Sequence, residues 1–292
     1  MKNTIKRGGL TGVVNNNGGE LVSFKDAKGT EYVWVGNADY WAGQAPVLFP
    51  IVSALKNSKV IIDGSEYTIP KHGFARKSEW NLAELKEDEA TFEISHDEKT
   101  LEVYPYKFKL YATHKLLENG FSTTYTVENT DTKDIKFFIG GHPGFNIPLD
   151  GKGKFEDYRL VFPQIENCVT TYCDADSLIR DEYTLPIMKN TDTYNFNHDD
   201  FDIDVFILQN LKSRSVKVLN KENKGFEFIF DGFDILGVWS PPKKRSPFIC
   251  LEPWVGLPSN VSESGKIEDK PFMVTLGAAK KYSVGYSMNI ID

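Results

Sequence analysis

The sequence predicts an all-β protein built as an antiparallel sandwich or barrel. Short runs alternate large apolar and polar side chains with a period of two, as half-buried strands do. Residues 121–127 show this alternation, and residues 107–116 show it just before them. Helical periodicity is scarce, and the apolar run at 44–55 is interrupted by Pro46 and Pro50. Many short strands without alternating helices favour antiparallel pairing over βαβ units.

Two tight turns join predicted strands into hairpins. Asn119-Gly120 separates the two alternating runs, and Asp63-Gly64 separates residues 60–62 from 67–69. Both dipeptides readily adopt the positive φ angles of a two-residue hairpin turn. In chain order, the further predicted strands cover residues 31–35, 90–95, 135–139, 215–219, 226–230, 235–239, 248–251 and 282–288. No repeat or flexible linker divides the chain, so we expect one domain over residues 1–292.

The composition is that of an ordinary globular protein, with 40% hydrophobic and 26% charged residues and a net charge of −7. Nucleic-acid binding needs a positive surface, and the densest basic run is only Lys243-Lys244-Arg245, so we expect no such partner. No signal peptide or run of roughly 18 apolar residues is present, so we expect no membrane partner. Three cysteines without zinc-finger spacing suit reduced thiols in the cytoplasm. Nothing indicates an oligomeric state.

Three segments interrupt the strand pattern with polar residues among glycines, prolines and aromatic residues: 70–76, 140–146 and 250–258. Such positions place a reactive side chain on a rigid rim. In the third segment Glu252 follows an apolar run, so we expect it at the end of a buried strand. Loss of water there raises the pKa of a carboxyl group and makes the carboxylate a better base at neutral pH. The alternative is an ordinary exposed loop glutamate.

The other two segments each contain a histidine. His142 has two glycines before it and Pro-Gly after it, and His72 has Lys71 and Arg76 nearby. An imidazole titrates near neutral pH and can donate a proton to a ring oxygen; a turn histidine bonded to a carbonyl is the alternative. Spacing disfavours a metal site, because there is no His-x-His or His-Glu-x-x-His motif. Phosphate-binding glycine loops are also absent, so we expect neither metal nor cofactor.

At these segments the sequence resembles the aldose 1-epimerase (galactose mutarotase) superfamily, especially its short, lactose-operon-associated bacterial branch. The matching motifs are His-Gly-Phe-Ala-Arg at 72–76, Gly-His-Pro-Gly-Phe at 141–145 and Glu-Pro-Trp-x-Gly at 252–256, with landmarks at 45–50 and 238–242. Each motif alone is weak, but five in order are specific. The resemblance implies a large antiparallel β-sandwich, the galactose mutarotase-like supersandwich. It also implies a small-molecule sugar as partner and interconversion of the α and β anomers of a free aldohexose.

The resemblance also implies roles for individual residues. Glu252 takes the proton of the anomeric hydroxyl, His142 protonates the ring oxygen, and His72 binds and polarises the sugar. Asp204 matches an acidic sugar-binding position, although Asp202 competes with it in the alternation. We expect the sugar-binding surface to be completed by Arg76, Trp254 and Asn146.

One departure from the family pattern concerns the segment after residues 48–50. Many relatives carry Gly-Arg there, whereas this chain has Ser53-Ala54. The loss removes a forked donor that lysine does not reproduce, and Arg76 covers it in part. The identity of the sugar is therefore not determined by the sequence. The alternative function is that of a non-catalytic carbohydrate-binding protein on the same fold. A glycoside hydrolase would need two suitably spaced carboxyl groups, and only one glutamate is well framed.

Overall fold

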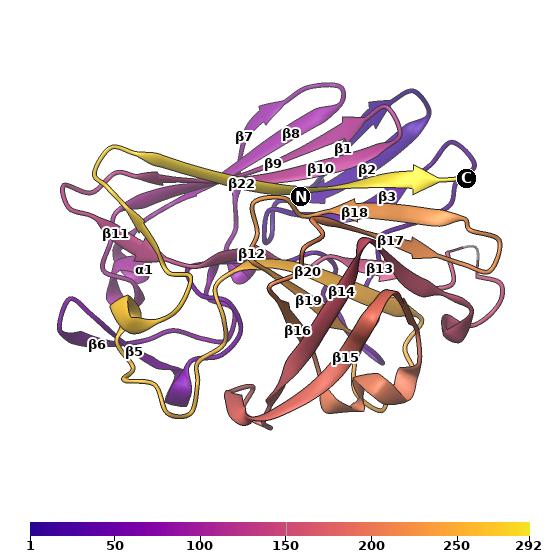
Figure 1. The fold of residues 1–292 in the computed structure, drawn as a ribbon. Helices are drawn as coiled ribbons and strands as arrows, with labels where there is room; N and C mark the ends of the chain where they lie inside the picture. The colour runs from indigo at the N-terminus through magenta and orange to yellow at the C-terminus, as the bar shows by residue number, and fades with distance from the viewer. Residues whose placement is uncertain (150) are drawn as a thin grey trace.

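The computed structural model describes residues 1–149 and 151–292. Two large antiparallel sheets pack face to face, and three small sheets flank them (Figure 1). The larger sheet has nine strands, in the order β15 (Ile179–Asn195), β14 (Arg159–Cys173), β17 (Ser215–Leu219), β18 (Gly225–Ile229), β22 (Lys281–Ile291), β10 (Gly120–Asn129), β9 (Phe108–Leu117), β8 (Glu89–Ser95) and β7 (Asn81–Leu85).

The second sheet has six strands. Its order is β16 (Phe206–Gln209), β19 (Ile235–Trp239), β20 (Phe248–Val255), β12 (Ile139–Gly141) and β4 (Val47–Leu48), with β13 (Gly144–Asn146) also paired to β20. The small sheets are β1 (Lys2–Arg7), β2 (Leu10–Asn15) and β3 (Glu20–Lys25); β5 (Lys59–Ile62) and β6 (Ser65–Thr68); and β11 (Ile135–Phe137) and β21 (Val274–Leu276). The helices are α1 (Glu98–Val103) and the 3-10 turns η1 (Lys56–Ser58), η2 (Ala75–Lys77), η3 (Phe155–Asp157), η4 (His198–Ile203) and η5 (Ile267–Asp269).

The core lies between the two large sheets. Phe145 of β13 meets Phe226 of β18, with ring centroids 4.6 Å apart, so side chains of opposite sheets interdigitate. Gly141 at the end of β12 permits an even closer approach. A Cβ there would lie 2.7 Å from a ring carbon of Tyr286 in β22, so any larger residue would push the sheets apart. The strand that leads into His142 is therefore seated firmly on the larger sheet.

The predicted all-β fold is confirmed, and so are both hairpins. Gly120 pairs with Leu117 across the β9–β10 turn, and Asp63 and Gly64 have φ angles of 49° and 82° in the β5–β6 turn. Residues 31–35 were wrongly expected to form a strand. They make only isolated bridges, because Glu31 pairs with Lys25 while Val33 pairs with Phe145 on another strand.

The longest strands, β14 and β15, lie in a part of the chain where no strand was predicted. Most β15 side chains are exposed and the β14–β15 register shifts repeatedly, so the period-two signal is lost. The short helix α1 was also missed; it starts at a capping box between Asp97 and Thr100 but is too short to show a helical period.

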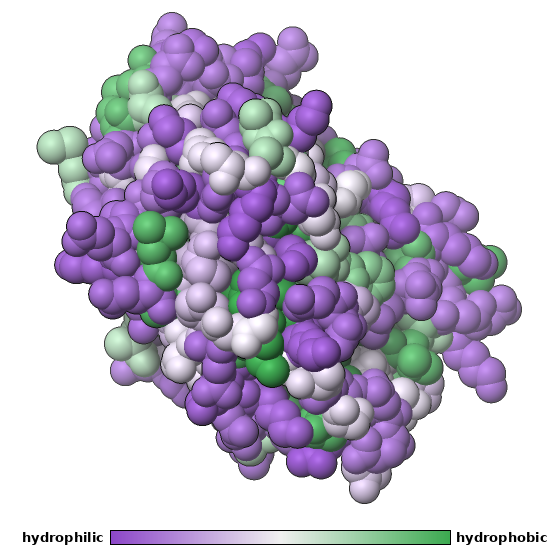
Figure 2. Space-filling view, turned by 90° about the vertical axis from the view of Figure 1, so that its left-hand side faces the viewer, coloured by the Kyte–Doolittle hydropathy of each residue, from purple (hydrophilic) through white to green (hydrophobic). Residues whose placement is uncertain are grey.

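The surface offers no large apolar face in the view of Figure 2, where hydrophilic residues dominate and apolar residues form small scattered groups. Within the described part of the chain, no helix has the length and hydropathy needed to cross a membrane.

Candidate active site

A cavity of about 260 Å³ opens where β19 and β20 meet the loops around them. Six of the seven predicted site residues line it: His72, Arg76, His142, Asp204, Glu252 and Trp254. These residues are spread over 183 positions of sequence, from His72 to Trp254, and strand β20 and the turns around it bring them together. The volume suits one small molecule rather than an extended chain.

The centre of the cavity is a contact between a histidine and a glutamate. Nε2 of His142 lies 3.2 Å from Oε2 of Glu252. Glu252 is 2% exposed and lies inside β20, which continues to Val255, rather than at the end of the strand as expected. His142 follows β12 directly, and its backbone N–H donates to the carbonyl of Pro46 at 3.1 Å. Both side chains are thus held by paired or bonded backbone.

Burial moves the pKa values of this pair in opposite directions. Loss of water raises the pKa of Glu252 well above its usual value; the charge of Asp204 raises it further, while Lys71, the nearby Trp254 indole and Arg76 oppose the rise. Burial, followed by the charge of Arg76, lowers the pKa of His142 to about 3. Burial therefore disfavours the charged form of each group, whereas the 3.2 Å contact between them stabilises the ionised pair.

His72 lies beside this pair, with its ring centroid 5.5 Å from that of His142. Its Nδ1 accepts a hydrogen bond from the backbone N–H of Ser53 at 3.1 Å. Burial, the neighbouring His142 and nearby cations lower the pKa of His72 well below its usual value. A neutral imidazole that accepts at Nδ1 carries its proton on Nε2, so His72 offers one N–H donor.

Aromatic rings enclose the imidazole of His142. Trp41 stacks on it with a centroid distance of 4.8 Å and an interplanar angle of 23°. Trp239 meets it edge-on at 5.5 Å and donates its indole N–H to Oδ1 of Asp204 at 2.6 Å. The Nδ1 atom of His142 is buried without a hydrogen-bond partner among the described residues. Two tryptophans thus supply flat apolar faces beside the polar centre.

The structure separates the two competing aspartates. Asp204 lines the cavity, in a left-handed backbone conformation with φ of 81°. Asp202 instead accepts a hydrogen bond from the backbone N–H of Lys243 at 2.8 Å and lies 3.6 Å from the guanidinium of Arg245. Asp204 is therefore the carboxylate available to a ligand.

Asn146 does not line the cavity, and the expectation that it binds sugar is not supported. Its side-chain amide donates to the carbonyls of Glu31 at 2.9 Å and Val33 at 3.0 Å. Both amide hydrogens are thereby used to hold the 31–33 segment against β13. Asn146 lies in the predicted motif, but its side chain stabilises the fold instead of facing the cavity.

A family model for aldose 1-epimerase matches residues 1–266, which include every segment that builds this cavity. The chain belongs to the aldose 1-epimerase family. Among its relatives, the plasmid and chromosomal forms of Protein LacX from Lactococcus lactis subsp. lactis are each 37% identical over 283 residues, covering 94% of both chains.

Solved structures agree with this membership. A galactose mutarotase related enzyme from Lactobacillus acidophilus superposes with a TM-score of 0.94 at 27% identity, covering 100% of this chain and 98% of the other. A galactose mutarotase-like protein from Lactobacillus casei ATCC 334 gives 0.91 at 27% identity, covering 99% and 100%. The resemblance and the galactose mutarotase-like sandwich expected from the sequence are both confirmed.

Several cavity residues of this aldose 1-epimerase family member were not among the predicted site residues. Trp41 lies in a loop with no periodic signal, and Trp239 was noted only as part of a landmark. Lys71 at the rim donates to the hydroxyl of Ser177 at 2.6 Å, so two walls of the cavity meet there. Ser177 lies in the turn between β14 and β15. The sequence pattern did not predict this hairpin, so it could not place Ser177 at the cavity.

One group among the described residues has the ligand types of a zinc site. The side-chain donor atoms of His142, Cys250 and Glu252 lie within 4.8 Å of one another, and all three residues are buried. Spacing rules missed this set because Cys250 and Glu252 share strand β20, whereas His142 follows a different strand, β12. Because His142 and Glu252 already contact each other, a bound cation and the acid–base pair would compete for the same atoms.

Proposed function

We propose that this chain is an aldose 1-epimerase that interconverts the α and β anomers of a free aldohexose. The observation that carries the proposal is the 3.2 Å contact between His142 Nε2 and Glu252 Oε2 in a buried cavity. The two oxygens that exchange protons in mutarotation, O1 and O5, are bonded to the same carbon. An acid and a base that serve them must therefore be close neighbours, and these two are.

The reaction balances with these two groups alone. The Glu252 carboxylate takes the proton from the anomeric hydroxyl, the C1–O5 bond breaks, and O5 receives the Nε2 proton of the His142 imidazolium. The carboxylate 3.2 Å away stabilises that imidazolium before the step, and both side chains are neutral after it. The C1–C2 bond of the open-chain aldehyde then rotates and presents the other carbonyl face. On closure O5 returns its proton to His142 while the carbonyl oxygen regains the proton of Glu252. Both groups return to their starting state.

The remaining cavity residues would bind the sugar. The Nε2–H of His72 and the guanidinium of Arg76 are donors toward hydroxyl oxygens, and Asp204 is an acceptor. Trp254 and Trp41 provide flat faces for the C–H side of a pyranose. We also propose that the protein works in the cytoplasm, since all three cysteines are free thiols.

The decisive experiment measures anomer exchange by NMR for several free aldoses with wild-type protein and the Glu252→Gln variant. The amide keeps the shape of the side chain but accepts no proton, so the rate should fall by about 10² to 10⁴-fold. Glu268→Gln is the matched control, because its side chain is 39% exposed and lies away from the cavity. An unchanged rate in Glu252→Gln would sink the proposal.

A second candidate is a non-catalytic carbohydrate-binding protein. It is favoured by Ser53-Ala54, which stands where the family pattern implies Gly-Arg; Ser53 lines the cavity but brings no guanidinium. Calorimetry that detects sugar binding, together with wild-type exchange no faster than in buffer, would select this candidate.

A further inference from the structure

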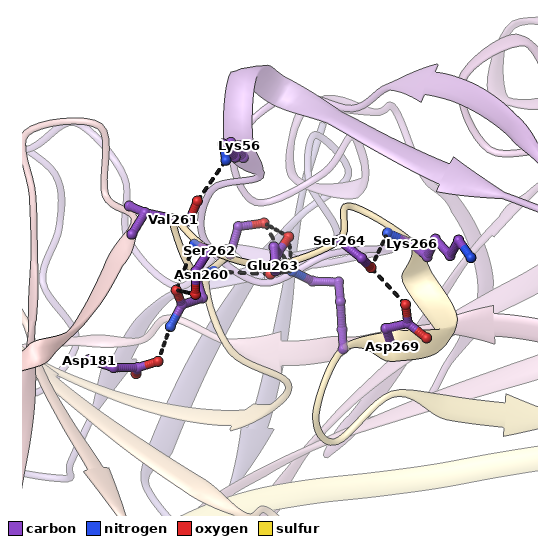
Figure 3. A network of polar contacts seen from close by, with 11 residues as sticks. Lys56, Asp181, Asn260, Val261, Ser262, Glu263, Ser264, Lys266 and Asp269 are labelled. Carbon is purple, nitrogen blue, oxygen red and sulfur yellow. Dashed lines mark hydrogen bonds and ion pairs between the residues drawn. The ribbon is translucent and has the colours of Figure 1, made fainter.

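The segment after β20 contains a charged cluster, buried at Ser259 and Lys270 and half-buried at Glu263, that takes no part in the proposed chemistry. Nζ of Lys270 lies 2.9 Å and 2.8 Å from the two carboxylate oxygens of Glu263, and it donates to Oγ of Ser259 at 2.9 Å. Ser259 in turn donates its hydroxyl to Oε1 of Glu263 at 2.6 Å. Figure 3 shows Glu263 in the middle of this network. We call Ser259, Glu263 and Lys270 the clamp.

Stability alone is a poor explanation for the ion pair in the clamp, because burying its charges costs hydration free energy. Lys270 is 7% exposed, and a buried ion pair loses hydration that the attraction repays only when geometry and further hydrogen bonds are good. Here those bonds are made, since Glu263 also accepts the backbone N–H of Asn260 at 3.0 Å. Such a network favours one conformation of the segment over others.

The backbone of Ser259 joins two walls of the cavity. Its N–H donates to the carbonyl of Ala54 at 2.8 Å, and its carbonyl accepts from the N–H of Ile179 at 2.8 Å. The second wall is held again by a bond from Val261 N–H to the Ile179 carbonyl at 3.2 Å. Ala54 follows Ser53, and Ile179 lies two residues after Ser177, so each wall ends in a cavity residue.

The first wall reaches a residue that would touch the sugar. Ser53 donates its N–H to Nδ1 of His72, and His72 donates its own N–H to the Ser53 carbonyl at 2.7 Å. Both residues have positive φ angles, 55° and 66°, which non-glycine residues keep only when their surroundings enforce them. A shift of Ser53 would therefore change the position and the tautomer of His72.

We propose that Ser259, Glu263 and Lys270 are positioning residues for the active site, acting through the Ala54 wall on His72. The catalytic part of this inference rests on the proposed function, whereas the effect on His72 does not. The clamp fixes the position of the 53–54 segment, and the Ser53 N–H then fixes which nitrogen of His72 carries the proton.

The test uses Glu263→Gln and Ser259→Ala in the full chain, with Glu268→Gln as the control on the same segment. Glu263→Gln removes the charge and leaves Lys270 unpaired, while Ser259→Ala keeps the ion pair and removes only the hydroxyl. Spectra of ¹⁵N-labelled histidine in sugar-free protein report the His72 tautomer. We expect the wild type and Glu268→Gln to show one neutral tautomer with the proton on Nε2, and both clamp variants to show tautomer averaging.

The kinetic readout is kcat in the anomer exchange assay, which should fall by about tenfold to 100-fold in folded clamp variants. If Glu263→Gln does not fold, Ser259→Ala carries the test. Wild-type His72 resonances with kcat within twofold of wild type in a folded clamp variant would overturn the inference. If wild-type protein shows no mutarotation, the proposed function fails, and the histidine spectra still decide whether the clamp positions His72.

Discussion

Ser53 and His72 are joined by two hydrogen bonds that run in opposite directions: Ser53 N–H donates to His72 Nδ1 at 3.1 Å, and His72 N–H donates to the Ser53 carbonyl at 2.7 Å. The first bond orients the ring and the second orients its backbone. Together they leave Nε2–H as the one donor that His72 can offer to a ligand.

This arrangement makes His72→Asn an informative substitution. Asparagine tolerates the left-handed backbone at φ 66°, and its side-chain oxygen can accept the Ser53 N–H. It does not replace the Nε2–H donor. We expect the exchange rate to fall by about 10² to 10³-fold, as for loss of one preorganised donor, with an unchanged melting temperature. NMR exchange and thermal unfolding check the two halves, and a large loss of stability would contradict the assignment.

The acid limb of the pH–rate profile should lie above the usual glutamate range, since Glu252 must be ionised to act as a base and its pKa is raised. Two substitutions should move this limb in opposite directions. Asp204→Asn removes a charge that raises the pKa of Glu252, so the limb moves to lower pH. Lys71→Met removes a charge that lowers it, so the limb moves to higher pH. Profiles of kcat/KM for the three proteins check this, and shifts of the same sign would refute it.

Trp41 should contribute to sugar affinity through its flat face. Trp41→Leu removes the ring that lies 4.8 Å from His142, and a loss of about 0.5–1.5 kcal/mol would raise the dissociation constant roughly twofold to tenfold. Trp41→Phe keeps an aromatic face and should lose less. Calorimetric titration with a free aldose measures both, and equal affinities for all three proteins would exclude a contribution from this ring.

Asn146→Ala should lower stability and leave sugar affinity unchanged. The substitution leaves the carbonyls of Glu31 and Val33 without their donors, which costs about 1–3 kcal/mol of unfolding free energy. Urea denaturation and calorimetric titration measure the two quantities. A raised dissociation constant in a fully folded variant would restore Asn146 to the binding surface.

His114 should destabilise the fold in acid. It is buried, its Nε2 lies 2.8 Å from the Gly19 carbonyl, and burial lowers its pKa to about 4 from the usual value of about 6.5. The unfolded chain therefore binds this proton first, and stability falls as pH decreases from 6.5 to 4 by about 3 kcal/mol from this residue. The unfolding free energy of His114→Gln should depend less on pH over that range, as urea denaturation at several pH values will show.

Where apolar and polar residues alternate along the chain, the sequence predicted the fold well. β9 and β10 combine regular alternation with an Asn-Gly turn, and both the strands and their pairing were correct. β15 fails for a physical reason, because an edge strand exposed on both faces needs no apolar side and so carries no pattern. Its hairpin partner β14 brings Cys173 to the cavity, which no local signal could indicate.

The candidate site was predicted only in part, because only some of its residues lie in local sequence motifs. His72, His142 and Glu252 stand in motifs with glycine, proline and tryptophan, and these motifs mark places where backbone approaches a ligand. Ser177 and Trp41 reach the cavity only through the tertiary fold, and Ser53 acts through its backbone N–H, which every residue but proline has. Sequence patterns reveal side-chain chemistry more readily than backbone donors.

The placement of Glu252 inside β20, with Ser53, Lys71, Ser177 and Asp204 on turns around it, separates two properties of the protein. In the proposed mechanism the base stands on a paired strand that tolerates little change, whereas Ser177 and Asp204 stand on turns outside that strand. Libraries randomised at Ser177 and Val205, which line the cavity outside the Ser53–His72 hydrogen-bond pair, are therefore a practical route to new sugar preferences. On the proposed function, the chain is a scaffold for directed evolution in which the substrate can be changed while the reaction is kept.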